Sequence, residues 1–228
     1  MAGDDEGAVP AADAPKIAVV DYDMGNRRSV EKALAHVGAQ TVLTRDPQTL
    51  ADADALVLPG VGAFPSGASS LRHHGLDVLL RERVSAGTPL LGICLGMQLL
   101  FDSSDELGMQ STGLGLIPGR VRALRAGGLR LPHIGWSDVR LERASLLSSR
   151  LPETGAPFYH VHSYVAEPDR DEDVVGTAQY GERFATLVAH GHVYGSQFHP
   201  EKSSRDGLAL LASFVALARD GRVQAVSA

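Results

Sequence analysis

The only cysteine of the chain lies in a segment whose residue types favour nucleophilic chemistry. The motif GICLG (92–96) follows an apolar run at 89–93, typical of a buried strand, and precedes a helical pattern over 95–101. A nucleophile at a strand-to-helix turn, with glycine two residues away on either side, is the layout of a nucleophile elbow, here with Cys94 in place of serine. The free N–H groups at the start of a helix favour a thiolate, and the N–H of Leu95 can face an oxyanion. The alternative is a small buried hydrophobe, the commonest role of a free cysteine.

A thiol nucleophile needs a base, and the base needs a group that orients it. The chain has nine histidines, so a histidine alone indicates little. His199-Pro200-Glu201 is more informative, because residues i and i+2 of an extended chain point to the same side. Glu201 can therefore reach the ring of His199 and fix its tautomer. The alternative is a strand end with a solvated glutamate.

Glycines also follow an earlier apolar run. In PGVG (59–62) they allow backbone N–H groups to approach a ligand closely. We interpret this loop as the source of a second oxyanion donor, at Val61 or Gly62. A plain tight turn explains the same residues.

Two pairs of histidines raise the possibility of a metal site. His160 with His162, and His190 with His192, have the i, i+2 spacing that places both rings on one face of a strand. No carboxylate lies at a recognisable ligand spacing beside them, and a hairpin turn explains the second pair. We therefore expect neither a metal nor a cofactor.

The pattern of apolar runs predicts the elements that position these groups. In the first half, strands and helices alternate, which predicts an α/β fold with a mixed, mainly parallel sheet flanked by helices. The second half has strands with few helices between them and adds antiparallel strands to the same core. The expected strands are 16–21, 41–45, 54–60, 89–93, 121–125, 158–165, 174–180, 184–190 and 193–199, and the expected helices are 29–37, 67–86, 95–101 and 207–217.

Composition narrows the class of protein. The chain has 228 residues, is 44% hydrophobic and carries a net charge of −6, which is ordinary for a globular protein. The acidic balance disfavours nucleic-acid binding. The longest apolar stretch, 89–101, is too short to span a membrane and contains two glycines. A lone cysteine excludes an internal disulfide and fits a reducing compartment, so we expect a cytoplasmic protein.

The same features predict how the chain is divided. Residues 1–15 are acidic and rich in alanine and proline, without the basic and apolar regions of a signal peptide, and predict a disordered leader. Residues 16–220 predict a single domain, and 221–228 a flexible tail.

From Lys16 to Arg219 the chain resembles the class I (triad) glutamine amidotransferases, through its elbow cysteine, its PGVG loop and its HPE motif. Within that family it is similar to the glutaminase subunits of imidazole glycerol phosphate synthase. The segments that carry this similarity are DYDMGNRRSV, PGVGAFPSG, GICLGMQLLF, LPHIGW, FYHVHSY and GSQFHPEKS.

The resemblance implies roles for individual residues. Cys94 would be the nucleophile, His199 the base and Glu201 the group that orients it, with Val61 and Leu95 donating to the oxyanion. The glutamine pocket would be formed by Gly60, Gly62, Gln98, Tyr159, His162, Ser163 and Tyr164. Asn26, Trp136 and Lys202 would lie near a partner subunit.

The implied activity is hydrolysis of L-glutamine to glutamate and ammonia through a Cys94 thioester. The ammonia would pass to a cyclase subunit with a (β/α)₈ barrel, in a heterodimer. That partner would make imidazole glycerol phosphate and an aminoimidazole carboxamide ribotide in histidine biosynthesis. The alternatives are a glutaminase that serves another synthase, and a catalytically silent subunit that stabilises a partner.

Three residues depart from the family pattern. Asp23 stands where the family usually has glycine, Arg27 where it has a hydrophobe, and Ser137 where it has asparagine. All three lie where the resemblance implies contact with the synthase subunit.

Overall fold

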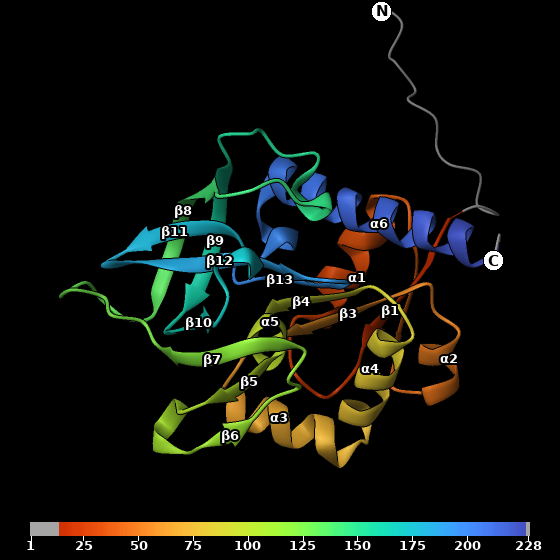
Figure 1. The fold of residues 1–228 in the computed structure, drawn as a ribbon, viewed down its shortest axis with the longest axis horizontal. Helices are drawn as coiled ribbons and strands as arrows, with labels where there is room; N and C mark the ends of the chain where they lie inside the picture. Colours follow the sequence, from red (N-terminus) through yellow and green to blue (C-terminus); the bar gives the residue numbers. More distant parts are fainter. Residues whose placement is uncertain (1–13, 227–228) are drawn as a thin grey trace, which may run out of the picture.

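The computed structural model of the protein describes residues 14–226. The leader predicted for 1–15 lies outside this range except for its last two residues, and so do the last two residues of the predicted tail. Among the described residues, thirteen strands join in one sheet (Figure 1). Its first part is parallel, in the order β2-β1-β3-β4. These strands are β1 (Lys16–Val20), β2 (Gln40–Thr44), β3 (Ala55–Gly60) and β4 (Leu90–Cys94).

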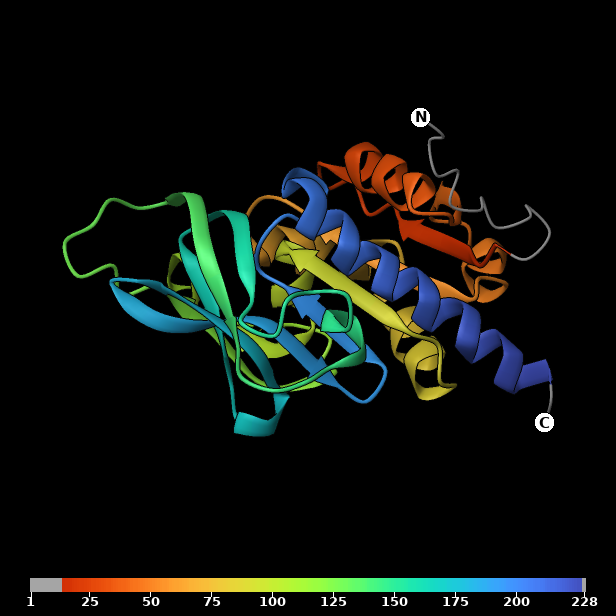
Figure 2. The same ribbon diagram turned by 90° about the horizontal axis from the view of Figure 1, so that it is seen from above.

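Helices cover both faces of the parallel part, because its strands are apolar on both faces. In β1, Ile17 and Val19 pack into one core with α1 and α6, whereas Ala18 and Val20 pack into a second core on the other face. Figures 1 and 2 show α1 and α6 on one side of the sheet and α2, α3 and α4 on the other. The helices are α1 (Arg27–His36), α2 (Pro47–Ala51), α3 (Phe64–His73), α4 (Leu76–Ser85), α5 (Leu95–Leu99) and α6 (Ser204–Val226).

The second part of the sheet is largely antiparallel. Strand β13 lies parallel to β4, and the sheet continues in the order β13-β12-β10-β7-β5-β6, with β11, β8 and β9 branching from β12. The hairpin predicted at 190–192 is confirmed, since β12 and β13 pair antiparallel through His190 and Val193. The strands are β5 (Phe101–Ser104), β6 (Ser111–Thr112), β7 (Ile117–Ala123), β8 (His133–Leu141), β9 (Ala156–His162), β10 (Tyr164–Pro168), β11 (Val174–Tyr180), β12 (Glu182–His190) and β13 (Val193–Ser196).

Several predicted elements are wrong in their extent. The helix expected over 67–86 is two helices, because Gly75 adopts a left-handed conformation (φ 67°) between α3 and α4. The strand expected over 158–165 is two strands, β9 and β10, separated at Ser163. The helix expected over 95–101 ends at Leu99, and Phe101 already belongs to β5. In the second and third cases, pairing with distant strands overrides the local pattern.

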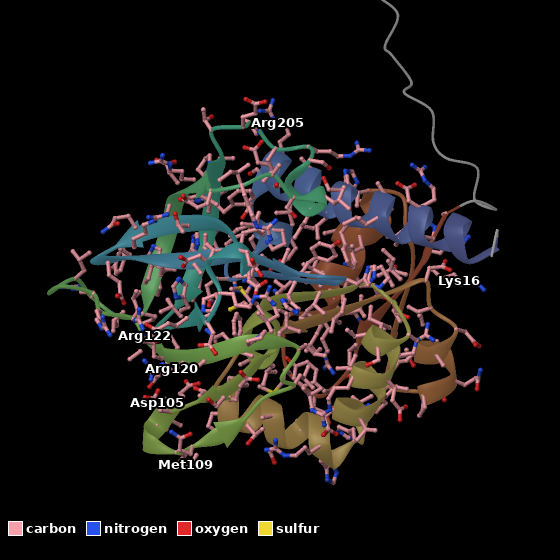
Figure 3. All side chains as sticks on the ribbon, in the orientation of Figure 1. Lys16, Asp105, Met109, Arg120, Arg122 and Arg205 are labelled. Carbon is pink, nitrogen blue, oxygen red and sulfur yellow. The ribbon has the colours of Figure 1, made fainter. Side chains whose placement is uncertain are left out.

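The ends of the described chain also differ in detail. Helix α6 runs to Val226, past the predicted domain boundary at 220 and beyond the helix expected over 207–217. The division into leader, domain and tail stays a prediction. None of the helices in residues 14–226 is long and apolar enough to cross a membrane. Figure 3 places Lys16, where β1 begins, at the opposite end of the molecule from Arg120 and Arg122 of β7.

Candidate active site

Cys94 occupies a strained turn between β4 and α5. Its backbone has φ 55° and ψ −110°, unusual for any residue except glycine, and α5 begins at the next residue. A Cβ on Gly92 would come within 2.7 Å of the Gly96 backbone, and a Cβ on Gly96 would overlap the Leu58 carbonyl oxygen. The two glycines are therefore required by the close approach of α5 to the sheet, as the motif predicted.

The thiol of Cys94 lies in a polar but enclosed environment. The residue is only 6% exposed. Its Sγ lies 3.8 Å from the carbonyl oxygen of Val161 and 3.7 Å from Nε2 of Gln197. Cys94 and His199 line the same cavity, and their interaction raises the pKa of the His199 ring. A thiol held by a buried histidine can lose its proton to that ring, which is the first requirement for nucleophilic attack.

His199 and Glu201 form the contact that the sequence predicted. Nδ1 of His199 lies 2.8 Å from Oε1 of Glu201. A carboxylate only accepts hydrogen bonds, so Nδ1 carries the proton and Nε2 is the nitrogen left for the thiol. The backbone reason differs from the one expected, since β13 ends at Ser196 and residues Pro200–Lys202 form a 3₁₀ turn. The turn, not an extended strand, brings the carboxylate back to the ring.

The environment of His199 favours its protonated form. Burial by itself lowers the pKa of the ring, but the hydrogen bonds to Cys94 and Glu201 and the charges of those groups raise the pKa to about 9. At neutral pH the ring is thus suited to pair with a thiolate and to protonate a leaving group.

A cavity of about 270 Å³ opens beside the thiol. It brings together most of the predicted pocket residues, but Gly60 and Tyr159 lie outside its lining. The lining consists of Val61, Gly62, Cys94, Leu95, Gln98, Glu106, Pro132, Val161, His162, Ser163, Tyr164, His199 and Lys202. The two exceptions are close behind it. Gly60 packs on the hydroxyl of Tyr22, and the Tyr159 carbonyl accepts the His199 N–H at 2.9 Å.

Glu106 is the one charged residue among the lining residues that the sequence did not predict, which also include Pro132 and Val161. It is the only acidic side chain around the cavity, and Oε2 accepts the N–H of Phe64 at 2.6 Å. Burial raises its pKa, and the bond from Phe64 partly opposes that shift. Glu106 lies in a short 3₁₀ turn after β5, in a segment with no periodic pattern, so no local signal pointed to it.

The polar residues of the pocket are fixed by bonds to one another. Gln98 donates through Nε2 to the carbonyl oxygen of Tyr164 at 3.1 Å and to Oε1 of Gln197 at 3.0 Å. His162 bonds the same Tyr164 carbonyl through Nδ1 at 3.0 Å. Strands β9 and β10, the segment that follows β13, and α5 are tied together in this way, so the walls of the cavity are preorganised.

The loop over the cavity has the glycine-dependent backbone conformation expected of the PGVG segment. Gly62 has a positive φ of 121°, and Val61 is 38% exposed at the mouth. Beneath Gly60, the buried hydroxyl of Tyr22 has no hydrogen-bond partner among the described residues. Its pKa is raised by burial and by the nearby Cys94. A neutral phenol therefore lies under the loop.

Three of the four histidines considered for a metal, His160, His162 and His190, are engaged in other bonds. His160 bonds the Phe158 carbonyl through Nδ1 at 3.0 Å and the Thr186 hydroxyl through Nε2 at 2.8 Å. His190 pairs with Asp173 at 2.9 Å. Within residues 14–226, no three histidine, cysteine or acidic side chains are grouped so that they could hold a metal ion.

The residues predicted to face a partner differ in their surroundings. Trp136 on β8 is 52% exposed, and its ring lies 6.1 Å from that of Tyr159. Lys202 is exposed and lines the cavity. Asn26 is half-buried, and its side chain is directed to Glu201.

Comparison with known proteins agrees with this geometry. Residues 18–217 match the family model described as "Glutamine amidotransferase class-I". The chain is 48% identical to the imidazole glycerol phosphate synthase subunit HisH of Moorella thermoacetica, over 89% of this chain and 95% of that protein. It is 46% identical to the HisH subunit of Bacillus cereus, over 87% and 93% of the two chains.

Solved structures share the fold. A structure described as a glutamine amidotransferase superposes with a TM-score of 0.69 at 25% identity, over 88% of this chain and 98% of that one. PurLQS from Thermotoga maritima superposes with a TM-score of 0.72 at 20% identity, over 90% and 99% of the chains, which shows likeness of fold alone.

Proposed function

Because the chain belongs to the class I glutamine amidotransferases and, within them, to the HisH subunits of imidazole glycerol phosphate synthase, we propose that Cys94, His199 and Glu201 are its catalytic residues. The protein is a glutaminase that supplies ammonia for imidazole glycerol phosphate synthesis in histidine biosynthesis. The observation that carries the residue assignment is the chain of contacts from the thiol through His199 to Glu201, at the wall of an enclosed cavity.

The proposed reaction has two acyl-transfer steps. The thiol proton of Cys94 first passes to Nε2 of His199, in keeping with the raised pKa of that ring, and the sulfur then attacks the side-chain amide carbon of L-glutamine. When the C–N bond breaks, His199 returns that proton to the leaving ammonia, and a γ-glutamyl thioester remains. A water molecule that gives its proton to His199 then attacks the thioester, and glutamate leaves as the thiol is re-formed. This chain's residues supply every proton transfer, so the mechanism calls for no cofactor or metal.

Both tetrahedral intermediates carry a negative oxygen that needs donors. We assign these donors to the N–H groups of Leu95, which begins α5, and of Val61, in the glycine loop. Removing one donor of an oxyanion hole typically reduces the rate by roughly 10²–10³-fold. The glycines on either side of Val61 allow its peptide to change orientation at little cost. This loop is thus where a partner subunit can regulate the rate.

The lining of the cavity fits the ends of a free amino acid. The glutamine side chain would extend to Cys94 past Gly62, Gln98 and Ser163. The buried carboxylate of Glu106 is suited to the α-ammonium group, since it is the one acidic side chain around the cavity. His162 and Tyr164 complete the wall opposite the loop. Gly60 and Tyr159 act from behind, by shaping the loop and by holding the backbone of His199.

The family implies a cyclase partner, and we propose a heterodimer with a (β/α)₈-barrel cyclase that binds over the cavity mouth. Lys202 is exposed and lines the cavity, Trp136 is 52% exposed beside Tyr159, and the neighbouring Ile134 is 61% exposed. Exposed apolar and aromatic side chains in one region are typical of an interface core. We place this biosynthetic pair in the cytoplasm.

Tryptophan fluorescence tests the docking face, because Trp136 is the only tryptophan. Adding a cyclase without tryptophan near the contact should shift the emission to the blue. Trp136→Ala should weaken the complex by about 2 kcal/mol or more. Lys202→Ala should reduce glutamine-dependent synthesis and spare ammonia-dependent synthesis. An unchanged spectrum at saturating partner, with full affinity in Trp136→Ala, would place the docking face elsewhere.

The decisive experiment for the residue assignment is Cys94→Ser. This variant should lose glutamine hydrolysis, because a serine hydroxyl lacks the thiolate character of cysteine, and its complex with the cyclase should still use free ammonia. Retained glutamine turnover would refute the assignment. Measuring wild-type hydrolysis with and without the cyclase and its nucleotide substrate distinguishes a glutaminase tied to this synthase from one that serves another. Failure of Cys94 to react with a chloroketone analogue of glutamine would favour a silent subunit.

A further inference from the structure

The side chain of Asn26 makes an unexpected long-range contact. Asn26 precedes α1 in a left-handed conformation (φ 73°, ψ 5°), the position where an asparagine ordinarily caps the helix. Its side chain makes no such bond. Instead, Nδ2 lies 2.6 Å from Oε1 of Glu201, 175 residues further along the chain. The resemblance to the family had implied only that Asn26 lies near a partner.

The chemistry of the acceptor fixes the direction of this bond. A carboxylate oxygen only accepts, so the amide of Asn26 donates through Nδ2. His199 donates through Nδ1 to the same Oε1 at 2.8 Å. The distance of 3.3 Å between Nδ2 of Asn26 and Nδ1 of His199 is therefore a contact between two donors that converge on one oxygen.

The carboxylate of Glu201 has few other hydrogen-bond donors. Its side chain is 0% exposed, and Oε2 has no hydrogen-bond partner among the described residues. A buried charged oxygen without donors is costly, so each donor on the other oxygen matters. If the amide of Asn26 is removed, His199 is the only described side chain that still bonds the Glu201 carboxylate. The carboxylate would then have no support that is independent of the ring it has to orient.

Resting on the triad assigned above, we propose that Asn26 is a positioning residue: its amide holds the carboxylate of Glu201 in the orientation that keeps His199 directed at Cys94. The side chain does not line the cavity and so does not touch the substrate. It acts through Glu201 and the base.

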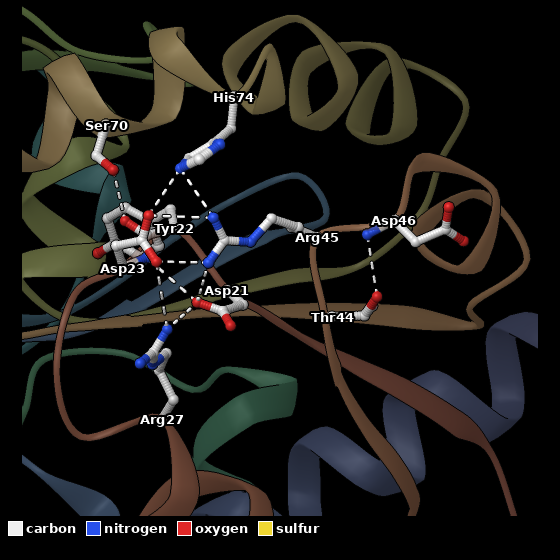
Figure 4. Close-up of polar contacts among 9 residues, drawn as sticks. All are labelled: Asp21, Tyr22, Asp23, Arg27, Thr44, Arg45, Asp46, Ser70 and His74. Carbon is white, nitrogen blue, oxygen red and sulfur yellow. Dashed lines mark hydrogen bonds and ion pairs between the residues drawn. The ribbon is translucent and has the colours of Figure 1, made fainter.

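The segment that carries Asn26 is itself held firmly, as positioning requires. Arg45 bonds the carboxylate of Asp23 at 3.1 Å and lies 3.2 Å from that of Asp21. His74 bonds Asp23 at 2.8 Å, and Arg27 pairs with Asp21 (Figure 4). The hydroxyl of Ser70 donates to the Tyr22 carbonyl at 2.6 Å.

Two of the departures from the family pattern are members of this network. Asp23 has the left-handed φ of 65° that suits the glycine usual in the family, and its charge binds Arg45 and His74. Arg27 bonds Asp21 in place of a hydrophobe. In this chain, therefore, charged groups fix the loop that ends at Asn26.

Two substitutions at Asn26 separate positioning from a purely structural role. Aspartate keeps the size, the tolerance of left-handed backbone and the capping ability of asparagine, whereas glycine keeps only the backbone freedom. If Asn26 merely starts α1, both variants should be nearly neutral. If Asn26 positions Glu201, Asn26→Asp should lose more activity than Asn26→Gly. Aspartate replaces the amide donor with a carboxylate, which repels the carboxylate of Glu201.

The assay uses the full chain with saturating cyclase and its nucleotide substrate. We expect kcat for glutamine to fall roughly 100-fold in Asn26→Asp and roughly 10-fold in Asn26→Gly, the range found when a residue that orients a functional group is lost. KM should change little. Both variants should remain folded at the assay temperature, and ammonia-dependent synthesis should be unchanged.

Gln48→Glu is the matched control. Gln48 is exposed on α2, and its amide donates to the Asp52 carboxylate at 3.0 Å, so the change creates the same pair of carboxylates away from the cavity. It should keep wild-type kcat. An equal loss in this control would make the effect one of net charge and overturn the proposal.

Other outcomes of the assay also test whether Asn26 positions Glu201. Wild-type kcat in both Asn26 variants refutes positioning. A loss that more cyclase restores would assign Asn26 to docking alone and likewise refute it. Cys94→Ser and His199→Ala, measured in parallel, test the triad separately. If they are inactive while the Asn26 variants are normal, only this inference fails, and if they retain activity, the proposed catalytic residues fail.

Discussion

Four buried histidines lie close together in this protein, and the pKa of one, His199, is shifted in the opposite direction from those of the other three, His133, His160 and His162. His199 is 1% exposed, and its pKa is raised to about 9. His160 is 0% exposed, and burial lowers its pKa to about 3, although its bond to the Phe158 carbonyl acts in the opposite direction. Burial also lowers the pKa of His162 and of His133. Since all four are buried, burial alone does not decide the charge.

The difference lies in the partners of the rings. His199 faces a carboxylate and a thiol, which both stabilise a positive ring. The other three face carbonyls, hydroxyls and one another. The Tyr164 carbonyl must receive the Nδ1 proton of His162, so Nε2 of His162 accepts from His133 at 3.3 Å, and His133 accepts from the Ser137 hydroxyl at 3.0 Å. Each neutral ring is satisfied by its neighbour. His199 is thus suited to exchange protons, whereas the other three histidines hold the pocket in place.

Replacing His199 should have the largest effect on this contrast. His199→Ala removes the base, and the glutaminase rate should fall on the order of 10⁶-fold, as when one member of a hydrolase triad is deleted. Single-turnover thioester formation is the measurement. If one of the other three histidines could substitute, His199→Ala would retain substantial activity, and the distinction between His199 and those three would be wrong.

Glu201→Gln should have a smaller effect, because the orienting group does not itself transfer the proton. We expect a loss of up to about 10⁴-fold in thioester formation, less than for His199→Ala. Both variants should be compared in the same single-turnover assay. Greater damage in Glu201→Gln than in His199→Ala would show that the two roles are misassigned.

An NMR titration sharpens the comparison directly. The ring of His199 should titrate near pH 9, and His160 should stay neutral down to about pH 3. Cys94→Ala should lower the pKa of His199, because the bond to the thiol is one cause of the rise. Folding raises this pKa above the ordinary value of 6.5, so the resulting stability is complete below pH 6.5 and is lost as the pH rises through about 9. A His199 resonance that titrates at 6.5 would contradict the contrast.

Thr186→Val should have the smallest effect and act on stability alone. The bond from His160 Nδ1 to the Phe158 carbonyl makes Nε2 an acceptor, and the variant leaves that buried nitrogen without its donor. The free energy of unfolding should fall by about 1–3 kcal/mol in urea titrations, with kcat unchanged. Thr112→Val, at an exposed position on β6, is the control and should change it by less than about 0.5 kcal/mol. Equal losses of unfolding free energy in both variants would show that the bond between Thr186 and His160 does not stabilise the fold.

The parts of the fold that local pattern specifies were predictable. Continuous apolar runs predicted β1, β3 and β4, and glycine spacing predicted the turn at Cys94, because only glycine fits where α5 meets β3 and β4. Strands β5, β6 and β8 were missed. In β8 the residues alternate in burial, but Gly135 interrupts the pattern and several outward side chains are apolar. Strands of this kind are specified by their neighbours more than by their own residues.

The sequence by itself determined which residues can do chemistry, since a cysteine between glycines and a histidine two residues from a glutamate are short-range features. Tertiary structure alone decided which groups surround them. Glu106 reaches the cavity from a turn without periodicity, and Asn26 reaches Glu201 across 175 residues. The opposite proton affinities of His199 and His160 were equally hidden, because a pKa depends on burial and on partners that come from distant strands. Local pattern fixes the backbone turn, whereas the charge and orientation of a side chain depend on contacts that exist only after the chain has folded.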